Sequence, residues 1–108
     1  DPDAQFELGK MLMRGEGGSA SPNQAARWFR LSAQKGHAGA QAMLGNLLFQ
    51  AGKTVRGLAM MTAALEHATG KDRIWIGDIQ EQAFSIADEA DRRTAMVLAG
   101  DIVKTGDF

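Results

Sequence analysis

The feature that most constrains the fold of this chain is a repeat with a spacing of 36 residues. When residues 3–14 are aligned with residues 39–50, five of the twelve positions are identical. The matched residues are Ala4 and Ala40, Gln5 and Gln41, Leu8 and Leu44, Gly9 and Gly45, and Leu12 and Leu48. A period of about 20–50 residues is typical of a solenoid, in which short structural units stack in series. The repeat therefore predicts a solenoid.

Each repeat begins with an α-helix pattern. Apolar residues recur at steps of three and four, as on one face of a helix; they are Ala4, Leu8, Met11 and Leu12, and then Ala40, Leu44, Leu47 and Leu48. Gly9 and Gly45 fall inside these helices, where glycine costs about 1 kcal/mol relative to alanine. Because that cost recurs at one repeat position, we expect another helix to cross closely at each glycine.

A second helix follows in each unit, at an offset of 32 residues. Its inner stripe is Ala25, Trp28, Phe29, Ser32 and Ala33 in the first unit, and Gly57, Met60, Met61, Ala64 and Leu65 in the second. Ser21, Pro22 and Gln24 predict the start of the first such helix, with Ser21 as its side-chain cap. Lys35 and Gly36 predict its end. A shorter loop in the second unit accounts for the change of offset.

A weaker third pair of helices is expected near the C-terminus. The first runs from about residue 74 to 87, with a stripe of Ile76, Ile79, Ala83, Phe84 and Ala87. Asp78 and Glu81 could mark a helix start inside it, so this boundary stays open. The last stripe is Ala95, Leu98, Ala99, Ile102 and Val103, with Gly106 as a stop. No Leu-Gly pair recurs here, which favours a degenerate or capping unit.

These patterns predict an all-α fold, an α-solenoid of about six helices in antiparallel pairs. Residues 1–108 are expected to form one domain, with repeats at 3–36 and 37–70 and the degenerate or capping pair at 71–108. The opening residues DPDAQF do not look like a natural start, so we expect the chain to be a fragment of a longer protein.

Composition argues against several functional classes. The net charge is −1 at pH 7, which is unlike a nucleic-acid-binding surface or a polybasic membrane anchor. There is no cysteine, so disulfides, thiolate metal sites and a cysteine nucleophile are ruled out. No apolar run approaches the ~18 residues of a membrane span. We therefore expect no nucleic-acid partner and no direct membrane insertion.

No set of residues in the sequence predicts catalysis or cofactor binding. Gly52, Lys53 and Thr54 match the end of a phosphate-binding loop, but Leu47 stands where its first glycine is required and a helix precedes it. The two histidines, His37 and His67, are thirty residues apart and lack partners at metal-ligand spacing. The acids among residues 88–93 suit a helix start better than acid–base chemistry. We expect no enzyme activity, cofactor or metal.

The repeat residues resemble the Sel1-like repeat, a relative of the tetratricopeptide repeat. The matching positions are Ala4, Leu8, Gly9, Gly15, Gly17, Ala25, Trp28, Phe29, Ala33, Gly36, His37, Ala40 and Gln41. Leu12 and Leu48 stand where the family has an aromatic residue, and Ser32 replaces an alanine. The resemblance is strong over residues 3–50, fair to about residue 70 and weak beyond. It implies stacked helix pairs with structural roles for Leu8, Gly9, Leu44, Gly45, Trp28 and Phe29.

In a solenoid of this kind, the first helices of successive pairs line a concave face that can bind a protein. Tetratricopeptide geometry places seven residues toward that groove: Phe6, Lys10, Met13, Arg14, Asn46, Phe49 and Gln50. Methionine and aromatic side chains suit a protein partner better than a charged polymer. The alternative, that Phe6 and Phe49 pack only on neighbouring helices, stays open.

Residues 36–53, 56–68, 75–84 and 88–95 are also similar to the periplasmic Sel1-repeat regulators of exopolysaccharide synthesis in alphaproteobacteria, the ExoR type. That resemblance implies a periplasmic, noncatalytic negative regulator that binds and restrains a sensor histidine kinase. Two alternatives remain: a generic Sel1-repeat scaffold that assembles a secretion or cell-envelope complex, and a small hydrolase, for which the sequence offers no residue set.

Overall fold

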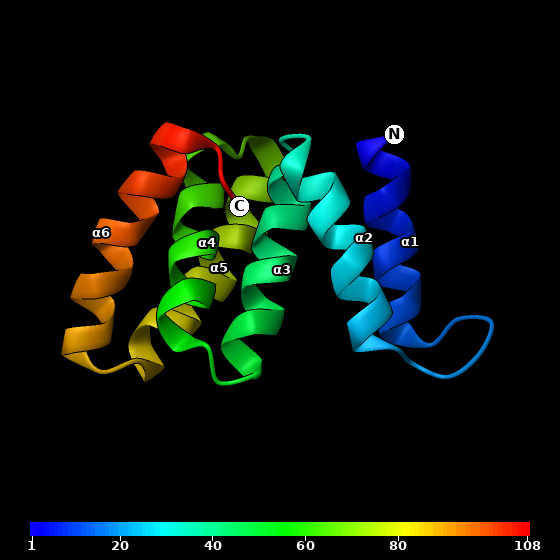
Figure 1. The fold of residues 1–108 in the computed structure, drawn as a ribbon, viewed down its shortest axis with the longest axis horizontal. Helices are drawn as coiled ribbons and strands as arrows, with labels where there is room; N and C mark the ends of the chain where they lie inside the picture. The colour runs from blue at the N-terminus through cyan, green and yellow to red at the C-terminus, as the bar shows by residue number, and fades with distance from the viewer.

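The structure, a computed structural model, describes residues 1–108 and contains six α-helices and no strand (Figure 1). The helices are α1 (Pro2–Arg14), α2 (Pro22–Gln34), α3 (Ala38–Gln50), α4 (Thr54–His67), α5 (Gly70–Ile86) and α6 (Glu89–Thr105). They form an elongated body of 41 × 24 × 23 Å with α1 at one end and α6 at the other. The predicted all-α fold of six helices is confirmed.

The helix starts reproduce the two repeat offsets found in the sequence. An offset of 36 carries the first residue of α1, Pro2, onto that of α3, Ala38. An offset of 32 carries the start of α2, Pro22, onto that of α4, Thr54. The difference lies in the loops, because residues 15–21 separate α1 from α2 while only residues 51–53 separate α3 from α4. Gly52 and Lys53 thus lie in the turn between two helices, and Thr54 begins α4.

Capping residues mark several of the helix ends, but Ser21 does not cap α2 as predicted. The side chains of Asp1 and Asp88 cap α1 and α6 by accepting backbone N–H bonds, and Gly106 ends α6 in the left-handed conformation as expected. Ser21 holds the cap position of α2, but its side chain accepts no bond there, so that prediction is wrong. Its backbone ψ of 85° differs from the 166° of the capping Asp88.

Glycines in the helix interiors allow the helices to approach closely, as the sequence predicted for Gly9 and Gly45. A Cβ on Gly45 would lie 2.8 Å from the carbonyl oxygen of Gly57, on the crossing helix α4. A Cβ on Gly57 would in turn lie 2.5 Å from the Gly45 oxygen. At Gly9, the space is filled by the ring of Phe29, whose nearest carbon would lie 2.6 Å away. Each position therefore accepts only a hydrogen atom without rearrangement.

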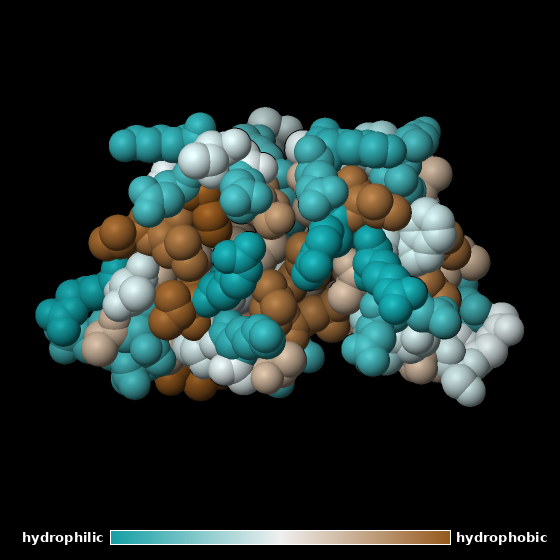
Figure 2. Space-filling view, in the orientation of Figure 1, coloured by the Kyte–Doolittle hydropathy of each residue, from teal (hydrophilic) through white to brown (hydrophobic).

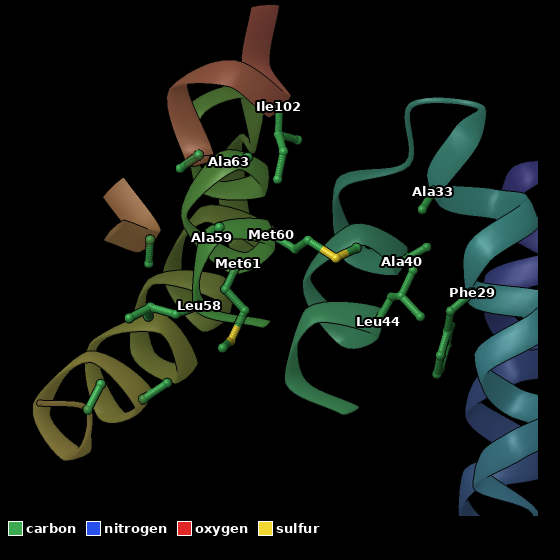
Figure 3. Close-up of a cluster of buried hydrophobic side chains, with 14 of the residues drawn as sticks. Phe29, Ala33, Ala40, Leu44, Leu58, Ala59, Met60, Met61, Ala63 and Ile102 are labelled. Carbon is green, nitrogen blue, oxygen red and sulfur yellow. The ribbon is translucent and has the colours of Figure 1, made fainter. Parts of the chain in front are cut away.

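The core runs along the stack between α2, α3 and α4 (Figure 3). Phe29 from α2 and Leu44 from α3 are fully buried, and Met60 extends from α4 toward α3. Among the other structural positions of the repeat, Gly9 and Gly45 are buried, while Leu8 and Trp28 are half-buried. Every residue from Gly57 to Ala64 is buried, which makes α4 the central helix. Many of these residues are alanine or glycine, so neighbouring helices lie close together.

The third pair of helices differs in detail from the predictions. Helix α5 begins at Gly70, four residues earlier than expected, so Asp78 and Glu81 lie inside the helix and are exposed. Helix α6 packs mainly on α4, and α5 packs on α4 and α3. Near the turn that joins α5 to α6, Arg92 donates hydrogen bonds to the carbonyl oxygens of Phe84 and Ser85. From this turn, α5 and α6 diverge (Figure 1).

None of the six helices combines the length and the apolar character needed to cross a membrane.

Candidate protein-binding surface

A groove between α3 and α5 brings together three of the seven residues predicted to bind a partner. Asn46, Phe49 and Gln50 from α3 face Ile79, Gln82, Ala83 and Ile86 from α5. We call these seven residues the α3–α5 groove. Its hollow has a volume of about 250 Å³, enough to receive one or two side chains of a partner but not a large ligand.

The chemistry of the α3–α5 groove is apolar with amide groups and no charge. Phe49 is half-buried, and Ile86 is 76 % exposed, which makes it the most exposed large apolar side chain of the molecule. The amides of Asn46 and Gln50 hydrogen-bond to each other over 3.4 Å and keep further donors and acceptors free. Apolar side chains rimmed by amides are typical of a surface that binds a protein.

An acidic strip continues along α5 from this groove. Asp78, Glu81, Gln82 and Ser85 line a neighbouring hollow, and Gln82 belongs to both. Both acids are exposed, and neither makes an ion pair within the chain. The surface next to the α3–α5 groove is therefore negative, which favours a partner segment that carries basic residues beside its apolar ones.

The four predicted groove residues on α1 do not line the α3–α5 groove. Phe6 packs on the rings of Phe29 and His37, with centroid distances of 5.8 and 4.5 Å, so for Phe6 the packing alternative describes the structure. The Lys10 ammonium lies 4.7 Å from the Phe6 ring centre and pairs with Glu7 over 3.0 Å. Met13 packs against the core, and Arg14 pairs with Glu16.

The repeat offset points to two of the four α5 residues that line the groove. Shifting Asn46 and Gln50 by 36 positions gives Gln82 and Ile86. Because Leu-Gly does not recur in α5, the sequence predicts a degenerate third unit and no groove residues there. Two groove positions of the repeat therefore recur in α5, although the glycine does not.

The histidines have structural contacts, and no three His, Cys, Asp or Glu side chains come together to hold a metal ion. His37 caps α3, because its Nδ1 accepts the N–H of Ala40 over 3.1 Å. Its Nε2 lies 3.0 Å from a carboxylate oxygen of Asp3, which joins the start of α1 to the start of α3. His67 lies 2.5 Å from the side-chain oxygen of buried Gln41, whose amide nitrogen donates to Ala33.

Replacing His37 with alanine should lower the free energy of unfolding by about 1–2 kcal/mol, because α3 loses its cap and Phe6 loses a ring contact. The His37→Asn variant should lose less than half as much, since asparagine can accept the same backbone N–H. Urea unfolding followed by circular dichroism measures both. Equal losses would contradict the capping role.

The chain matches a known repeat family and is similar to two curated proteins. The Sel1 repeat family matches residues 2–37 and 38–60 of the chain. A protein of Rhizobium leguminosarum bv. viciae named "Exopolysaccharide production negative regulator" is 53% identical over 106 residues, which are 98% of this chain and 40% of that protein. A protein of the same name from Rhizobium meliloti (strain 1021) is 52% identical over 97 residues, which are 90% of this chain and 36% of that protein.

The chain thus spans about two-fifths of the length of the curated relatives that it matches. No solved structure matches it significantly.

Proposed function

Because this chain belongs to the Sel1 repeat family, we propose that it is a noncatalytic module of a negative regulator of exopolysaccharide production. In this proposal it acts in the periplasm, where it binds the sensing domain of a sensor histidine kinase and restrains it. The names of the two relatives and the protein-binding character of helical repeats support the regulatory part. The kinase and the compartment rest on the resemblance to the ExoR-type regulators.

The observation that carries the proposal is the α3–α5 groove. Ile86 exposes an apolar side chain next to Phe49 and Ile79, where burial by a partner removes apolar surface from water. The amides of Asn46 and Gln82 can hydrogen-bond to the main chain of the bound segment whatever its sequence. The groove thus combines an apolar anchor with polar groups that orient a peptide.

The binding partner proposed for the groove has two features. It presents an apolar side chain to Ile86 and Phe49, and it carries basic residues near Asp78 and Glu81. Exposed opposite charges contribute little affinity but raise the association rate, so binding should be faster at low ionic strength.

We expect Ile86→Gln to weaken binding of the periplasmic domain of the sensor kinase by tenfold or more, as is typical for a central apolar anchor. Ile74→Gln is the matched control, because Ile74 lies on the same helix, is 68 % exposed and is not part of the groove. Isothermal titration calorimetry should find the control within about twofold of the wild type.

The result distinguishes a wrong interface from a wrong partner. If the wild-type chain binds and both variants bind equally well, the groove is not the interface. If the wild-type chain does not bind the sensing domain at all, the kinase proposal fails, and a scaffold role in an envelope complex becomes the better explanation.

A further inference from the structure

A second recessed surface lies between α2 and α4, on the other side of α3 from the groove. Figure 2 shows apolar surface over α3 between hydrophilic side chains that lie over α2 and α4. It is lined by Arg30 and Gln34 of α2, Leu44 and Leu48 of α3, Arg56 and Met60 of α4, and Phe108 of the C-terminal tail. We call it the α2–α4 cleft. At 100° per residue, Leu44 and Leu48 project from α3 roughly opposite to Asn46 and Phe49, so the two sites face different ways.

The α2–α4 cleft is positively charged. Arg30 and Arg56 lie on its two walls and are both exposed, and no acidic residue is among its lining residues. Neither guanidinium has a hydrogen bond or an ion pair within the chain. Of the five other arginines, four are engaged, whereas Arg27 is not: Arg14 pairs with Glu16, Arg73 with the Leu65 carbonyl, Arg92 with the Phe84 and Ser85 carbonyls, and Arg93 with Glu89. The cleft thus carries two unpaired positive charges in a chain whose net charge is −1.

The shape of the cleft limits what can enter. Its volume is about 260 Å³, and its floor is formed by Leu44 and Met60, each only 1 % exposed. Phe108 also lines the cleft, and its ring stacks on that of His67, with ring centres 6.2 Å apart. The space is suited to an acidic side chain held between two guanidinium groups, with a short apolar neighbour against Leu48. A guanidinium binds a carboxylate through two parallel hydrogen bonds, which an ammonium cannot do.

We propose that the α2–α4 cleft binds an acidic peptide segment of a protein partner, with a carboxylate placed between Arg30 and Arg56. The complementary charge of the cleft is the argument for that occupant. A nucleic acid or other long polyanion requires a continuous row of basic residues. This chain instead has one arginine on each wall of the cleft and acidic residues along α5. This site is independent of the α3–α5 groove and of the kinase proposal.

The test uses the intact chain and a fluorescein-labelled decapeptide of alternating aspartate and phenylalanine, measured by fluorescence anisotropy at low salt. We expect saturable binding, and we expect the paired substitution Arg30→Glu and Arg56→Glu to weaken it at least tenfold. The matched control pair is Lys71→Glu and Arg93→Glu, which changes the net charge equally at exposed sites outside the cleft and should stay within twofold. Circular dichroism establishes that each variant is folded.

Two further ligands test whether binding depends on the acidic groups of a peptide. A decapeptide with lysine in place of aspartate should not bind, and heparin should bind no more tightly to the wild type than to the control pair. The milder pair Arg30→Gln and Arg56→Gln should also weaken the acidic peptide. The proposal is overturned if the wild type shows no saturable binding, if both charge-reversed pairs lose the same affinity, or if heparin binds where the acidic peptide does not.

Discussion

Replacing Gly57 with alanine is expected to lower the free energy of unfolding by about 2–4 kcal/mol, although alanine is the better helix former. The added Cβ would lie 2.5 Å from the Gly45 oxygen, 2.5 Å from the Phe49 nitrogen and 2.8 Å from its Cα. All three atoms belong to the backbone, so no side-chain rotation relieves the overlap. Helices α3 and α4 must separate, and the core between them loses contact. Urea unfolding of the purified chain measures the loss.

Gly100 provides the matched control for this experiment. It lies inside α6 as Gly57 lies inside α4, but it is exposed, and a Cβ there would meet no atom within 4 Å. Gly100→Ala should therefore raise the free energy of unfolding by about 0.5–1 kcal/mol, through the higher helix propensity of alanine. If Gly57→Ala proved as harmless as Gly100→Ala, the close crossing of α3 and α4 would not exist in solution.

The largest loss from removing a side chain is expected at Phe29. Phe29→Ala should cost about 3–5 kcal/mol, because the ring is completely buried and fills the space left by Gly9. That is a large part of the 5–15 kcal/mol that holds a typical domain folded, so partial unfolding at 37 °C is expected. Thermal and urea unfolding followed by circular dichroism measure the change.

Leu31→Ala is the control, since Leu31 lies on the same helix with 44 % of its surface exposed. It should change the stability by no more than about 0.5 kcal/mol. A double-mutant cycle adds a specific test of the contact: Gly9→Ala should destabilise the wild type more than it destabilises the Phe29→Ala variant, because the ring that the new methyl group meets is gone. Additive effects would contradict the packing of Phe29 on Gly9.

The parts of the fold that follow from local pattern were predictable from the sequence. Leu-Gly at a 36-residue spacing predicted both the helix repeat and the close crossings at Gly9 and Gly45, and the structure confirms them. Helix starts were less certain. Ser21 and Asp88 are both residues that commonly cap helices, but only Asp88 does so, because capping depends on backbone angles that residue type does not determine.

The arrangement of the last two helices was not predictable from repeat logic alone. The third unit was expected to be an antiparallel pair, whereas α6 packs mainly on α4. A signal was present: residues 57–64 of α4 are small or apolar on all sides, which is typical of a helix with neighbours all around it. A stripe pattern shows which face of a helix is buried but not which neighbour covers it.

The sequence placed the candidate groove residues on α1 and α3, but only those on α3 line the α3–α5 groove. Asn46, Phe49 and Gln50 line one hollow on α3, as their helical spacing predicts, and their role in binding a partner stays a prediction. The assignment of Phe6 to the same groove assumed regular stacking of α1 on α3. Instead, the Phe6 ring packs between Phe29 and His37, where burial stabilises it.

Our central proposal is that this chain binds a protein partner through residues of α3 and α5. Nuclear magnetic resonance on the ¹⁵N-labelled chain, titrated with the periplasmic domain of the sensor kinase, tests it most directly. We expect the largest chemical-shift changes on the backbone amides of residues 46–50 and 79–86 and on the side-chain amides of Asn46, Gln50 and Gln82. Shift changes confined to α1 and α2, or none at saturating partner, would contradict it.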